Sequence, residues 1–542
     1  MLKKYISLLL CVAFTATISS DGFAQRAISG DSKLILIHLD GASGYHVKDE
    51  MEKGNLPNLE SFFKEDQRIE YAVTYFPSKT PTVISSIRQG IPLEEAIIPG
   101  WESVDDDDFI RGIVPNFIEM ALSKSRLAVT NLLYGVPLFY PLAGPALVNT
   151  ADYLKDYNIL EFYWYRVDSE GHFRGEESYR KELAVFDKHF GKLVNRLDED
   201  VNIIIYSDHG MAFGEGIEID DELESVIGDN FKLFSYPTLF LNESKNLQEY
   251  AKKIVKETEL DFAFYQSDNG DVIGIHDDGE IYFSSVNEFI RYDFEGVDAL
   301  QYYENGYNGE YWNRDQWLEF SHKLDYPLTP LNLYYYLQNP NSGDIVTLFE
   351  AGFFPRTSYS RSGNHGGITK DEMITPLFVK GPEIDELYGL DYFWLPDLFD
   401  QIHGIKFNQA PLRDRHFIST RYDFRNSRQI SQFSFSPNYR IRYGANIYLN
   451  EDQNFSRSDI WGKVDFYRSY LVRMWMGTGL EIKDSRYRPI FFLQHDIHVR
   501  KFVFQSSIAT NRQFYFTTSW EVLPWLALES VNFNSLGVRI DF

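Results

Sequence analysis

Residues 34–41 read Leu-Ile-Leu-Ile-His-Leu-Asp-Gly, an apolar run that ends in a carboxylate and a glycine. A continuous apolar run is typical of a strand that is buried on both faces of a sheet. Asn202–Tyr206 and Pro376–Val379 have the same character, and Tyr179–Leu197 places its apolar residues at helical spacing. We therefore predict an α/β domain whose mainly parallel central sheet is flanked by helices.

Side chains of types that can bind metal ions follow the apolar runs or lie in a glycine-rich loop. They are Asp40, Asp168, His172, Asp208, His209 and His365. Each motif by itself is weak evidence for a metal site. Because parallel strands bring their carboxyl ends to one edge of a sheet, we expect the six side chains to converge. Three histidines and three aspartates suit zinc, with manganese or another divalent ion as the alternative.

Thr80 is the candidate nucleophile, in the segment Phe76–Thr82. A threonine hydroxyl is a poor nucleophile at neutral pH, and metal coordination makes it competent by lowering its pKa. Helical residues, Val83–Ile87, follow it, so we expect its oxygen near a helix N-terminus, where an anionic group is also favoured. A capping role for this threonine is compatible with that chemistry.

These motifs together resemble the alkaline phosphatase superfamily and, within it, the type I phosphodiesterase/nucleotide pyrophosphatase branch. The resemblance runs from about Lys33 to Gly404. It rests on Leu39-Asp40-Gly41, Pro77-Ser78-Lys79-Thr80 with Gly90, Asp168 to His172, Ser207 to Met211, and Gly363 to Gly366.

The resemblance implies the superfamily's central sheet and hydrolysis of phosphate esters through a phospho-threonine intermediate at Thr80. It also implies two Zn²⁺ ions in separate sites. One site would consist of Asp168, His172 and His365, and the other of Asp40, Thr80, Asp208 and His209.

One segment departs from the branch. An asparagine that donates to a phosphoryl oxygen usually follows the nucleophile by about twenty residues, where this chain reads Ile98-Pro99-Gly100-Trp101-Glu102. A backbone N–H of Gly100 or Trp101 is the candidate replacement, and Trp101 could instead stack on a substrate group. The departure leaves the substrate open between a phosphate-ester small molecule and a lipid headgroup.

Two other functions use the same residues differently. The first is a phospho-group transferase or phosphonate hydrolase with the same site, and the second is a non-catalytic surface protein on this scaffold. The net charge of −27 argues against nucleic acid as the main partner, because phosphate backbones select basic surfaces.

Charge divides the chain near Pro411. Residues 411–542 carry 18 basic and 12 acidic residues, whereas residues 1–410 carry 34 basic and 67 acidic ones. The predicted catalytic domain is therefore 25–410. Within it, residues 286–340 are rich in tyrosine, asparagine and acids, and we interpret them as an insertion over the site or as a surface elaboration.

Residues 411–542 alternate apolar and polar side chains over segments of about ten residues, which predicts antiparallel β-structure. About eight such strands suffice for a small closed barrel. Leu536–Phe542 resembles the closing strand of bacterial outer-membrane barrels. Trp475, Trp520 and Trp525 are candidates for interfacial belts, and the basic excess suits anionic lipid headgroups. The alternative is a soluble β domain.

The first residues are typical of a secretory signal. Lys3 and Lys4 precede the short apolar run Ile6–Ile18, and we expect cleavage after Ala24, with a retained anchor as the alternative. Cleavage would remove Cys11, the only cysteine, and leave histidines and carboxylates as metal ligands. We expect the protein at the periplasmic face of the outer membrane, or otherwise periplasmic or secreted.

Overall fold

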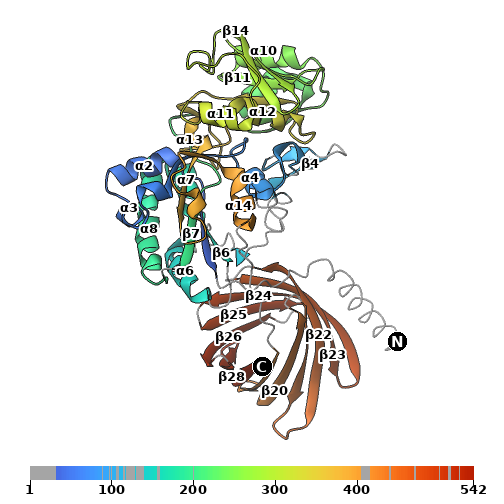
Figure 1. Ribbon diagram of the computed structural model, residues 1–542. Helices are drawn as coiled ribbons and strands as arrows, with labels where there is room; N and C mark the ends of the chain where they lie inside the picture. Colours follow the sequence, from blue (N-terminus) through green and yellow to red (C-terminus); the bar gives the residue numbers. More distant parts are fainter. Residues whose placement is uncertain are drawn as a thin grey trace.

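The computed structural model describes residues 32–87, 90–96, 98, 100–104, 109–113, 116, 128–129, 140–154, 159–198, 200–404, 416–438, 441–468, 472–499, 501–510, 514–523 and 525–541. Figure 1 shows a central α/β part, a second α/β part next to it, and a β-barrel on the opposite side. The expected signal segment 1–24 and the domain boundary near Pro411 lie outside the described residues.

The central sheet has seven strands in the order β18-β2-β17-β7-β1-β6-β5. In chain order they are β1 (Lys33–Leu39), β2 (Arg68–Val73), β5 (Ala128–Val129), β6 (Ile159–Trp164), β7 (Val201–Tyr206), β17 (Ile374–Lys380) and β18 (Tyr392–Trp394). β1 pairs in parallel with β6 and β7, and only β17 runs antiparallel to its neighbours. The predicted mainly parallel sheet is confirmed.

Helices cover both faces of this sheet because β1 alternates its apolar side chains between them. Ile35 and Ile37 pack against one helical layer, and Leu34 and Leu36 against the other. The first layer contains α2 (Gly44–Glu52), α3 (Pro57–Phe62), α6 (Tyr140–Tyr153) and α8 (Glu176–Val194). The second contains α4 (Thr80–Ile87) and α14 (Leu398–Gly404). Among the described residues, no helix is both long and apolar enough to cross a membrane.

The second α/β part is built on another seven-stranded sheet, in the order β14-β13-β12-β11-β15-β10-β9. Its strands are β9 (Phe231–Ser235), β10 (Thr238–Leu241), β11 (Phe262–Gln266), β12 (Val272–His276), β13 (Gly279–Val286), β14 (Phe289–Gly296) and β15 (Ile345–Leu348). Its helices are α10 (Leu247–Glu257), α11 (Arg314–Ser321) and α12 (Thr329–Gln338). The tyrosine-rich residues 286–340 supply β14, α11 and α12, so they are one portion of this larger unit.

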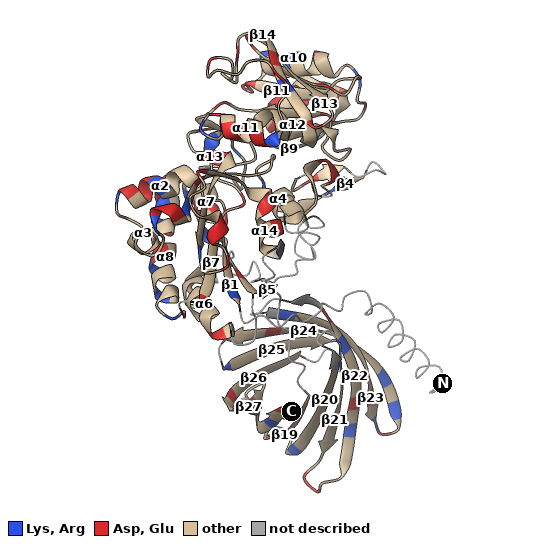
Figure 2. Ribbon diagram, in the orientation of Figure 1, with Lys and Arg blue, Asp and Glu red and all other residues tan. Residues whose placement is uncertain are grey.

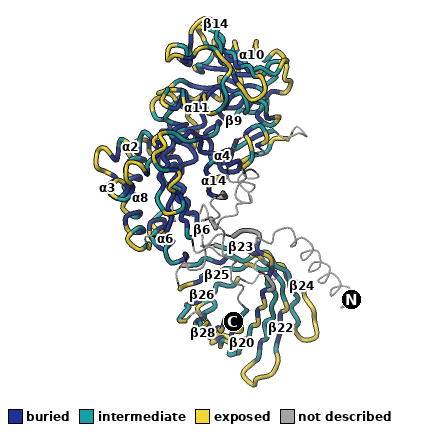
Figure 3. The backbone as a smooth tube through the Cα atoms, viewed as in Figure 1, coloured by how far each residue is buried: buried dark blue, intermediate teal, exposed yellow. Residues whose placement is uncertain are grey.

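The chain also forms short elements that belong to neither seven-stranded sheet. They are β3 (Ser103–Val104), β4 (Ile110–Arg111), α7 (Arg166–Arg174), β8 (Glu215–Ile217), α9 (Asp220–Ile227), β16 (Phe353–Pro355) and α13 (Lys370–Met373). Figure 3 shows that the central sheet is the most continuously buried part of the backbone, whereas the barrel strands are largely of intermediate burial.

The C-terminal part is a closed barrel of ten antiparallel strands. They are β19 (Phe417–Asp423), β20 (Arg428–Asn438), β21 (Ile441–Leu449), β22 (Phe455–Arg468), β23 (Val472–Lys483), β24 (Arg486–Val499), β25 (Phe502–Ala509), β26 (Phe514–Leu523), β27 (Leu526–Val531) and β28 (Ser535–Asp541). β28 pairs with β19 and closes the cylinder. The expected barrel is confirmed, but the number of eight strands is wrong. Short strands such as β19 and β27 fall below the ten-residue segments used for the sequence count.

The barrel is apolar outside and polar inside. On β28, Leu536, Val538 and Ile540 are exposed, whereas Arg539 and Asp541 are buried. Trp520 and Trp525 are about half exposed, but Trp475 is buried. Its expected place in an interfacial belt is therefore wrong. Met476, its neighbour on β23, points outward, so the alternation turns Trp475 into the lumen, where its Nε1 donates to Asp496.

The barrel contacts the central part at the edge where the parallel strands begin. The Tyr153 hydroxyl donates to the backbone oxygen of His498 at 3.0 Å, and Ile497 packs against the apolar layer around α6 and α8. Tyr153 ends the helix that precedes β6, and Arg196, beside the barrel cavity, precedes β7. The carboxyl ends of β1, β6 and β7 therefore face away from the barrel.

Candidate metal centre

The seven residues predicted from the sequence meet at the carboxyl edge of the central sheet. Asp40 follows β1, Asp208 and His209 follow β7, and Thr80 is the first residue of α4. Asp168 and His172 lie one turn apart on α7, and His365 lies in the loop before α13. Every one of these side chains is at most 4% exposed.

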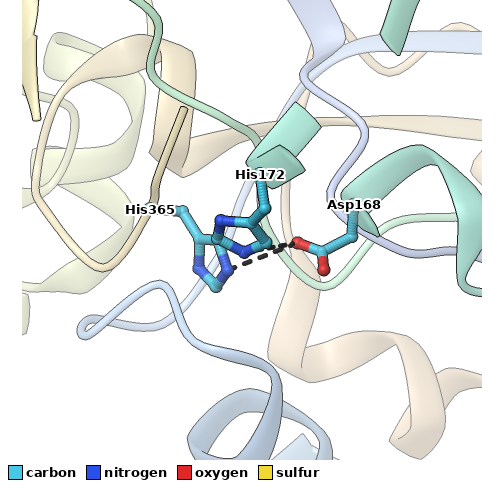
Figure 4. A group of neighbouring side chains, drawn as sticks. All are labelled: Asp168, His172 and His365. Atoms are coloured by element: carbon cyan, nitrogen blue, oxygen red, sulfur yellow. Dashed lines mark ion pairs between the residues drawn. The ribbon is translucent and has the colours of Figure 1, made fainter. Parts of the chain in front are cut away.

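Asp168, His172 and His365 form the first group of potential ligands. His172 Nε2 lies 3.2 Å and His365 Nε2 lies 3.4 Å from the same carboxylate oxygen, Asp168 Oδ1. Figure 4 shows both rings directed at that carboxylate. Three donor atoms converging from a helix and a distant loop have the composition of a zinc site with histidine and carboxylate ligands.

The second group surrounds Thr80. Its Oγ1 lies 3.0 Å from His209 Nε2 and 3.5 Å from Asp40 Oδ1. His209 Nε2 is also 3.5 Å from Asp40 Oδ1 and 3.4 Å from Asp208 Oδ2. The candidate nucleophile is therefore held among potential metal ligands, at the first turn of a helix.

The two groups are adjacent. Asp40, Asp168 and His209 also bring one ligand atom each within 4.8 Å of one another. The rings of His209 and His365 stack with 3.6 Å between their centroids. The arrangement therefore has the composition and proximity for two neighbouring metal ions rather than two unrelated sites.

Backbone carbonyl groups orient the three imidazoles. Nδ1 of His172 lies 3.0 Å from the Gly363 oxygen, Nδ1 of His209 lies 2.8 Å from the Gly210 oxygen, and Nδ1 of His365 lies 2.6 Å from the Ser78 oxygen. A proton on each Nδ1 leaves Nε2 as the free ligand atom. Such outer contacts are typical of histidines that bind metals.

The segment that carries the nucleophile is tied to the loop that carries His365. Ser78 Oγ accepts from the Gly366 N–H at 3.0 Å and donates to the Gly367 oxygen at 3.1 Å. Lys79 Nζ donates to the Tyr236 oxygen, and burial lowers the pKa of Lys79 to about 7. These contacts fix Thr80 relative to His365 although the two residues are far apart in the sequence.

The carboxylates repel one another in a buried space. Burial, together with Asp208 and Asp168, raises the pKa of Asp40 well above its usual value. Burial opposes ionisation of Asp168 and Asp208 too, but neighbouring histidines hold the pKa of both below the usual value. Asp168 Oδ1 and Asp208 Oδ2 are buried without a hydrogen-bond partner. Buried carboxylate oxygens of this kind fit a bound cation.

His38 and Tyr163 are site residues that the sequence analysis missed. His38 Nε2 lies 3.0 Å from Asp208 Oδ1. Its ring stacks on Tyr206 and makes an edge-to-face contact with Tyr163. The Tyr163 hydroxyl donates to Asp40 Oδ2. The available signal was His38 itself, an imidazole inside an apolar strand, two residues before Asp40.

Gly100 and Trp101, the candidate substrate-binding residues, lie beside the second group. Trp101 packs against a small cluster that includes Tyr163, whose hydroxyl contacts Asp40. The side-chain amide of buried Asn116 donates to the backbone oxygens of Gly100, at 3.3 Å, and Trp101, at 3.0 Å. Asn116 therefore shapes this segment, a role that the sequence analysis did not anticipate.

Comparison with known proteins shows which family this region resembles. Residues 102–368 match the family model described as type I phosphodiesterase / nucleotide pyrophosphatase. The mouse (Mus musculus) protein bis(5'-adenosyl)-triphosphatase enpp4 is 28% identical over 233 residues, which cover 36% of this chain and 49% of that protein. The chain thus matches about half the length of this curated relative.

Several solved structures are also similar. Murine ectonucleotide pyrophosphatase / phosphodiesterase 5 has a TM-score of 0.45 and 13% identity, covering 69% of this chain and 95% of that chain. An inactive form in complex with AMP has a TM-score of 0.46 and 14% identity, with coverage of 71% and 97%. The human protein has a TM-score of 0.44 and 14% identity, with coverage of 69% and 95%.

The matched range contains Asp168, His172, Asp208, His209 and His365, whereas Asp40 and Thr80 precede it. The structure joins those two earlier residues to the matched ones in a single buried centre. Over residues 102–368, this chain is therefore similar to the type I phosphodiesterase / nucleotide pyrophosphatase family.

Proposed function

We propose that this protein hydrolyses phosphate esters, with Thr80 as nucleophile and two divalent metal ions, zinc being the first choice. The observation that carries the proposal is the position of Thr80 Oγ1, 3.0 Å from His209 Nε2 and 3.5 Å from Asp40 Oδ1, inside the buried cluster. The similarity to this family supports the same class of reaction.

Asp168, His172 and His365 would hold one ion, and Asp40, Asp208 and His209 the other, next to Thr80. When bound, the ions would lower the pKa of the threonine hydroxyl and offset charge on the phosphoryl oxygens. Thr80 Oγ1 would form a bond to phosphorus while the bond to the leaving oxygen breaks. Water would then cleave the phospho-threonine, returning the free hydroxyl and releasing the phosphorylated product.

The N-terminus of α4 has a supporting role in this step. Thr80 begins the eight-residue helix. Pro81 has no N–H, and the Val83 N–H donates to the Lys79 oxygen. The first turn therefore offers the N–H groups of Thr80 and Thr82 near the attacking oxygen. These groups and the helix dipole favour an anionic phosphoryl group at that position. The contacts of Ser78 with the His365 loop keep the turn in place.

Nucleotide diesters and phosphoanhydrides are the proposed substrates. The mouse relative is named as a bis(5'-adenosyl)-triphosphatase, and one similar structure was solved with AMP. Trp101 is a half-buried aromatic side chain close to Tyr163, and it offers a base a surface for stacking. Phosphate monoesters are the alternative within the same reaction class.

The decisive test compares Thr80→Ala and Thr80→Ser in the full chain. Hydrolysis of bis(p-nitrophenyl) phosphate and of a dinucleoside polyphosphate is measured with zinc and with manganese. Thr80→Ala should reduce turnover to the background rate with metal content unchanged, and Thr80→Ser should retain part of it, because it keeps a hydroxyl. Undiminished hydrolysis by Thr80→Ala would refute the proposed nucleophile.

We also propose that the barrel inserts into a bacterial outer membrane and holds the catalytic part on the periplasmic side. Large apolar side chains are exposed around it, including Phe433, Ile460, Phe491, Ile508 and Phe514. An even number of strands keeps both ends on one side, and the paired residues Phe417 and Asp541 mark that side. Cleavage of residues 1–24 as an export signal belongs to the same proposal.

Cell fractionation tests this location. The full chain should remain with outer membranes after a carbonate wash and dissolve only in detergent. Recovery in the soluble periplasmic fraction, without detergent, would contradict membrane insertion but leave the proposed hydrolysis unaffected.

A further inference from the structure

The barrel encloses a cavity of about 950 Å³. Side chains from strands around the barrel line it, together with Tyr153 and Arg196 from the catalytic part. Figure 2 shows basic residues recurring along the barrel strands, and several of them point into this space. The lumen is therefore charged, in contrast to the apolar outer surface.

Three cations surround one indole in this cavity. Lys463 Nζ lies 4.4 Å, Arg473 Cζ lies 5.2 Å and Arg442 Cζ lies 5.4 Å from the ring centroid of Trp475. Trp475 itself is 1% exposed, so the cations gather in the interior of the barrel. A ring can accommodate nearby cations through its electron-rich face, but it cannot neutralise three positive charges.

Two other arginines of the lumen are paired with carboxylates. Arg539 lies 3.2 Å from Glu529 and 3.1 Å from Asp541, and Arg457 lies 2.8 Å from Asp459 and 3.0 Å from Glu481. These pairs follow the usual rule that buried charges are paired.

Arg442 and Lys463 differ from them. Arg442 Nε donates to Ser436 Oγ at 2.9 Å, and Lys463 Nζ donates to Gln494 Oε1 at 2.9 Å, so both acceptors are neutral. Among the described residues, no carboxylate oxygen lies within 4.0 Å of either cation. Lys463 is only 7% exposed. Burial lowers the pKa of Lys463 to about 7, and a bound anion would favour its charged form.

Asp496 is a buried carboxylate in the same network. Its two oxygens accept from Trp475 Nε1 at 2.8 Å and from Gln494 Nε2 at 2.5 Å. The same Gln494 holds Lys463 through its oxygen. Both donors to Asp496 are neutral, so its carboxylate offsets one of the three positive charges around Trp475, and Asp465, 3.9 Å from Arg473, offsets a second. Within the described part of the barrel, one positive charge of the three is left without a carboxylate.

We propose that the lumen binds a small tetrahedral oxyanion, such as inorganic phosphate, between Arg442 and Lys463. The guanidinium of Arg442 has parallel N–H donors that match two oxygens of such an anion, and the ammonium adds a compact charge. Arg473 lies 5.2 Å from the Trp475 ring, and Asp465, 3.9 Å away, offsets its charge. The site does not depend on the proposed hydrolysis, although that reaction would supply a phosphorylated product.

Phosphate binding to the full chain in detergent tests the site. Equilibrium dialysis with labelled inorganic phosphate compares the natural chain with the double variant Arg442→Gln/Lys463→Gln. The variant should lose one phosphate site, or weaken it at least about tenfold, because charged hydrogen bonds contribute roughly 1.5–3 kcal/mol each. Phosphate held at the metal centre is common to both proteins and serves as an internal reference.

The matched control is Arg488→Gln, which removes an exposed arginine from β24 and should leave phosphate binding unchanged. Hydrolysis should also be unchanged in the double variant. Equal phosphate binding by the natural chain and the double variant would overturn the proposal, as would displacement of phosphate by equimolar chloride.

If the double variant does not fold, Trp475→Phe provides a second measurement. Phosphate should quench tryptophan fluorescence of the natural chain, and no quenching, or equal quenching in Trp475→Phe, would also overturn it.

Discussion

The metal centre and the barrel lumen bury charge in opposite ways. The centre brings Asp40, Asp168 and Asp208 together, with buried oxygens that have no hydrogen-bond partner. The lumen pairs Arg457 and Arg539 with carboxylates of neighbouring strands. We interpret an excess of one charge sign as the mark of a ligand site. The proposed ligand is a cation in the centre and an anion between Arg442 and Lys463.

Chelation of the metal ions should produce the largest loss of stability and activity, and the loss of stability should be confined to the catalytic part. Removing the ions leaves the buried carboxylates facing one another, so that part should lose stability while the barrel does not. Zinc at 1,000 times its Kd would contribute about 4 kcal/mol. Activity should fall to background with EDTA and return with zinc. Two calorimetric transitions, one of them shifted by EDTA, would support this contrast, and an unchanged profile would contradict it.

A charge on the outer face of the barrel should cause the next largest loss, a loss of barrel stability in lipid. Val538→Arg places a cation among exposed apolar side chains, which costs about 2–4 kcal/mol at the middle of a bilayer. The matched control is Phe533→Arg in the turn before β28, where the cost should be about 0–1 kcal/mol. Folding into lipid vesicles is measured by urea titration. Equal stabilities of the two variants would indicate that the outer face is in water.

His38 should affect metal affinity rather than the fold. Replacement by leucine removes the contact with Asp208 and should weaken metal binding about 10–100-fold, the usual range for a residue behind a ligand. His38→Gln keeps an N–H donor and should recover part of the loss. Competition with a chromophoric chelator measures both variants. Equal metal affinity in the natural chain and His38→Leu would assign the histidine to packing alone.

Replacement of Trp101 should have the smallest effect, a rise in KM only for substrates that contain a base. Trp101→Ala should raise KM for a dinucleotide about fivefold, because loss of a stacked base costs at least about 1 kcal/mol. A dialkyl phosphate has no base and serves as the matched substrate, for which KM should not change. An equal rise for both substrates would point to a distorted Gly100 segment instead.

The sequence predicts the central sheet and the convergence of the seven site residues because both depend on local patterns. A buried parallel strand is a continuous apolar run, and a carboxylate directly after it marks the functional edge, as at Asp40 and Asp208. The barrel is predicted for a similar reason, since its strands alternate strictly. Its strand number was missed because short strands give too few alternations to count.

The remaining errors concern partners that are distant in the sequence. In the sequence, His38 is one residue of an apolar strand, and its role depends on Asp208, which the neighbouring strand β7 places beside it. Trp475 fits a membrane-facing position in the sequence, but its Nε1 donates to Asp496, which the neighbouring strand β24 places beside it inside the barrel. Asn116 gains its role only through the backbone of Gly100 and Trp101. Single-sequence patterns do not contain these pairings.

The docking of the barrel on the starting edge of the parallel strands determines which molecules can encounter Thr80. β1 spans seven residues, so about 20 Å of sheet separates the two edges at roughly 3.3 Å per residue. With the barrel inserted in a bilayer, as proposed, a lipid would have to leave that bilayer completely to arrive at Thr80. An enzyme anchored in this way would act on dissolved molecules, and its turnover would follow their concentration in the surrounding fluid rather than the composition of the membrane.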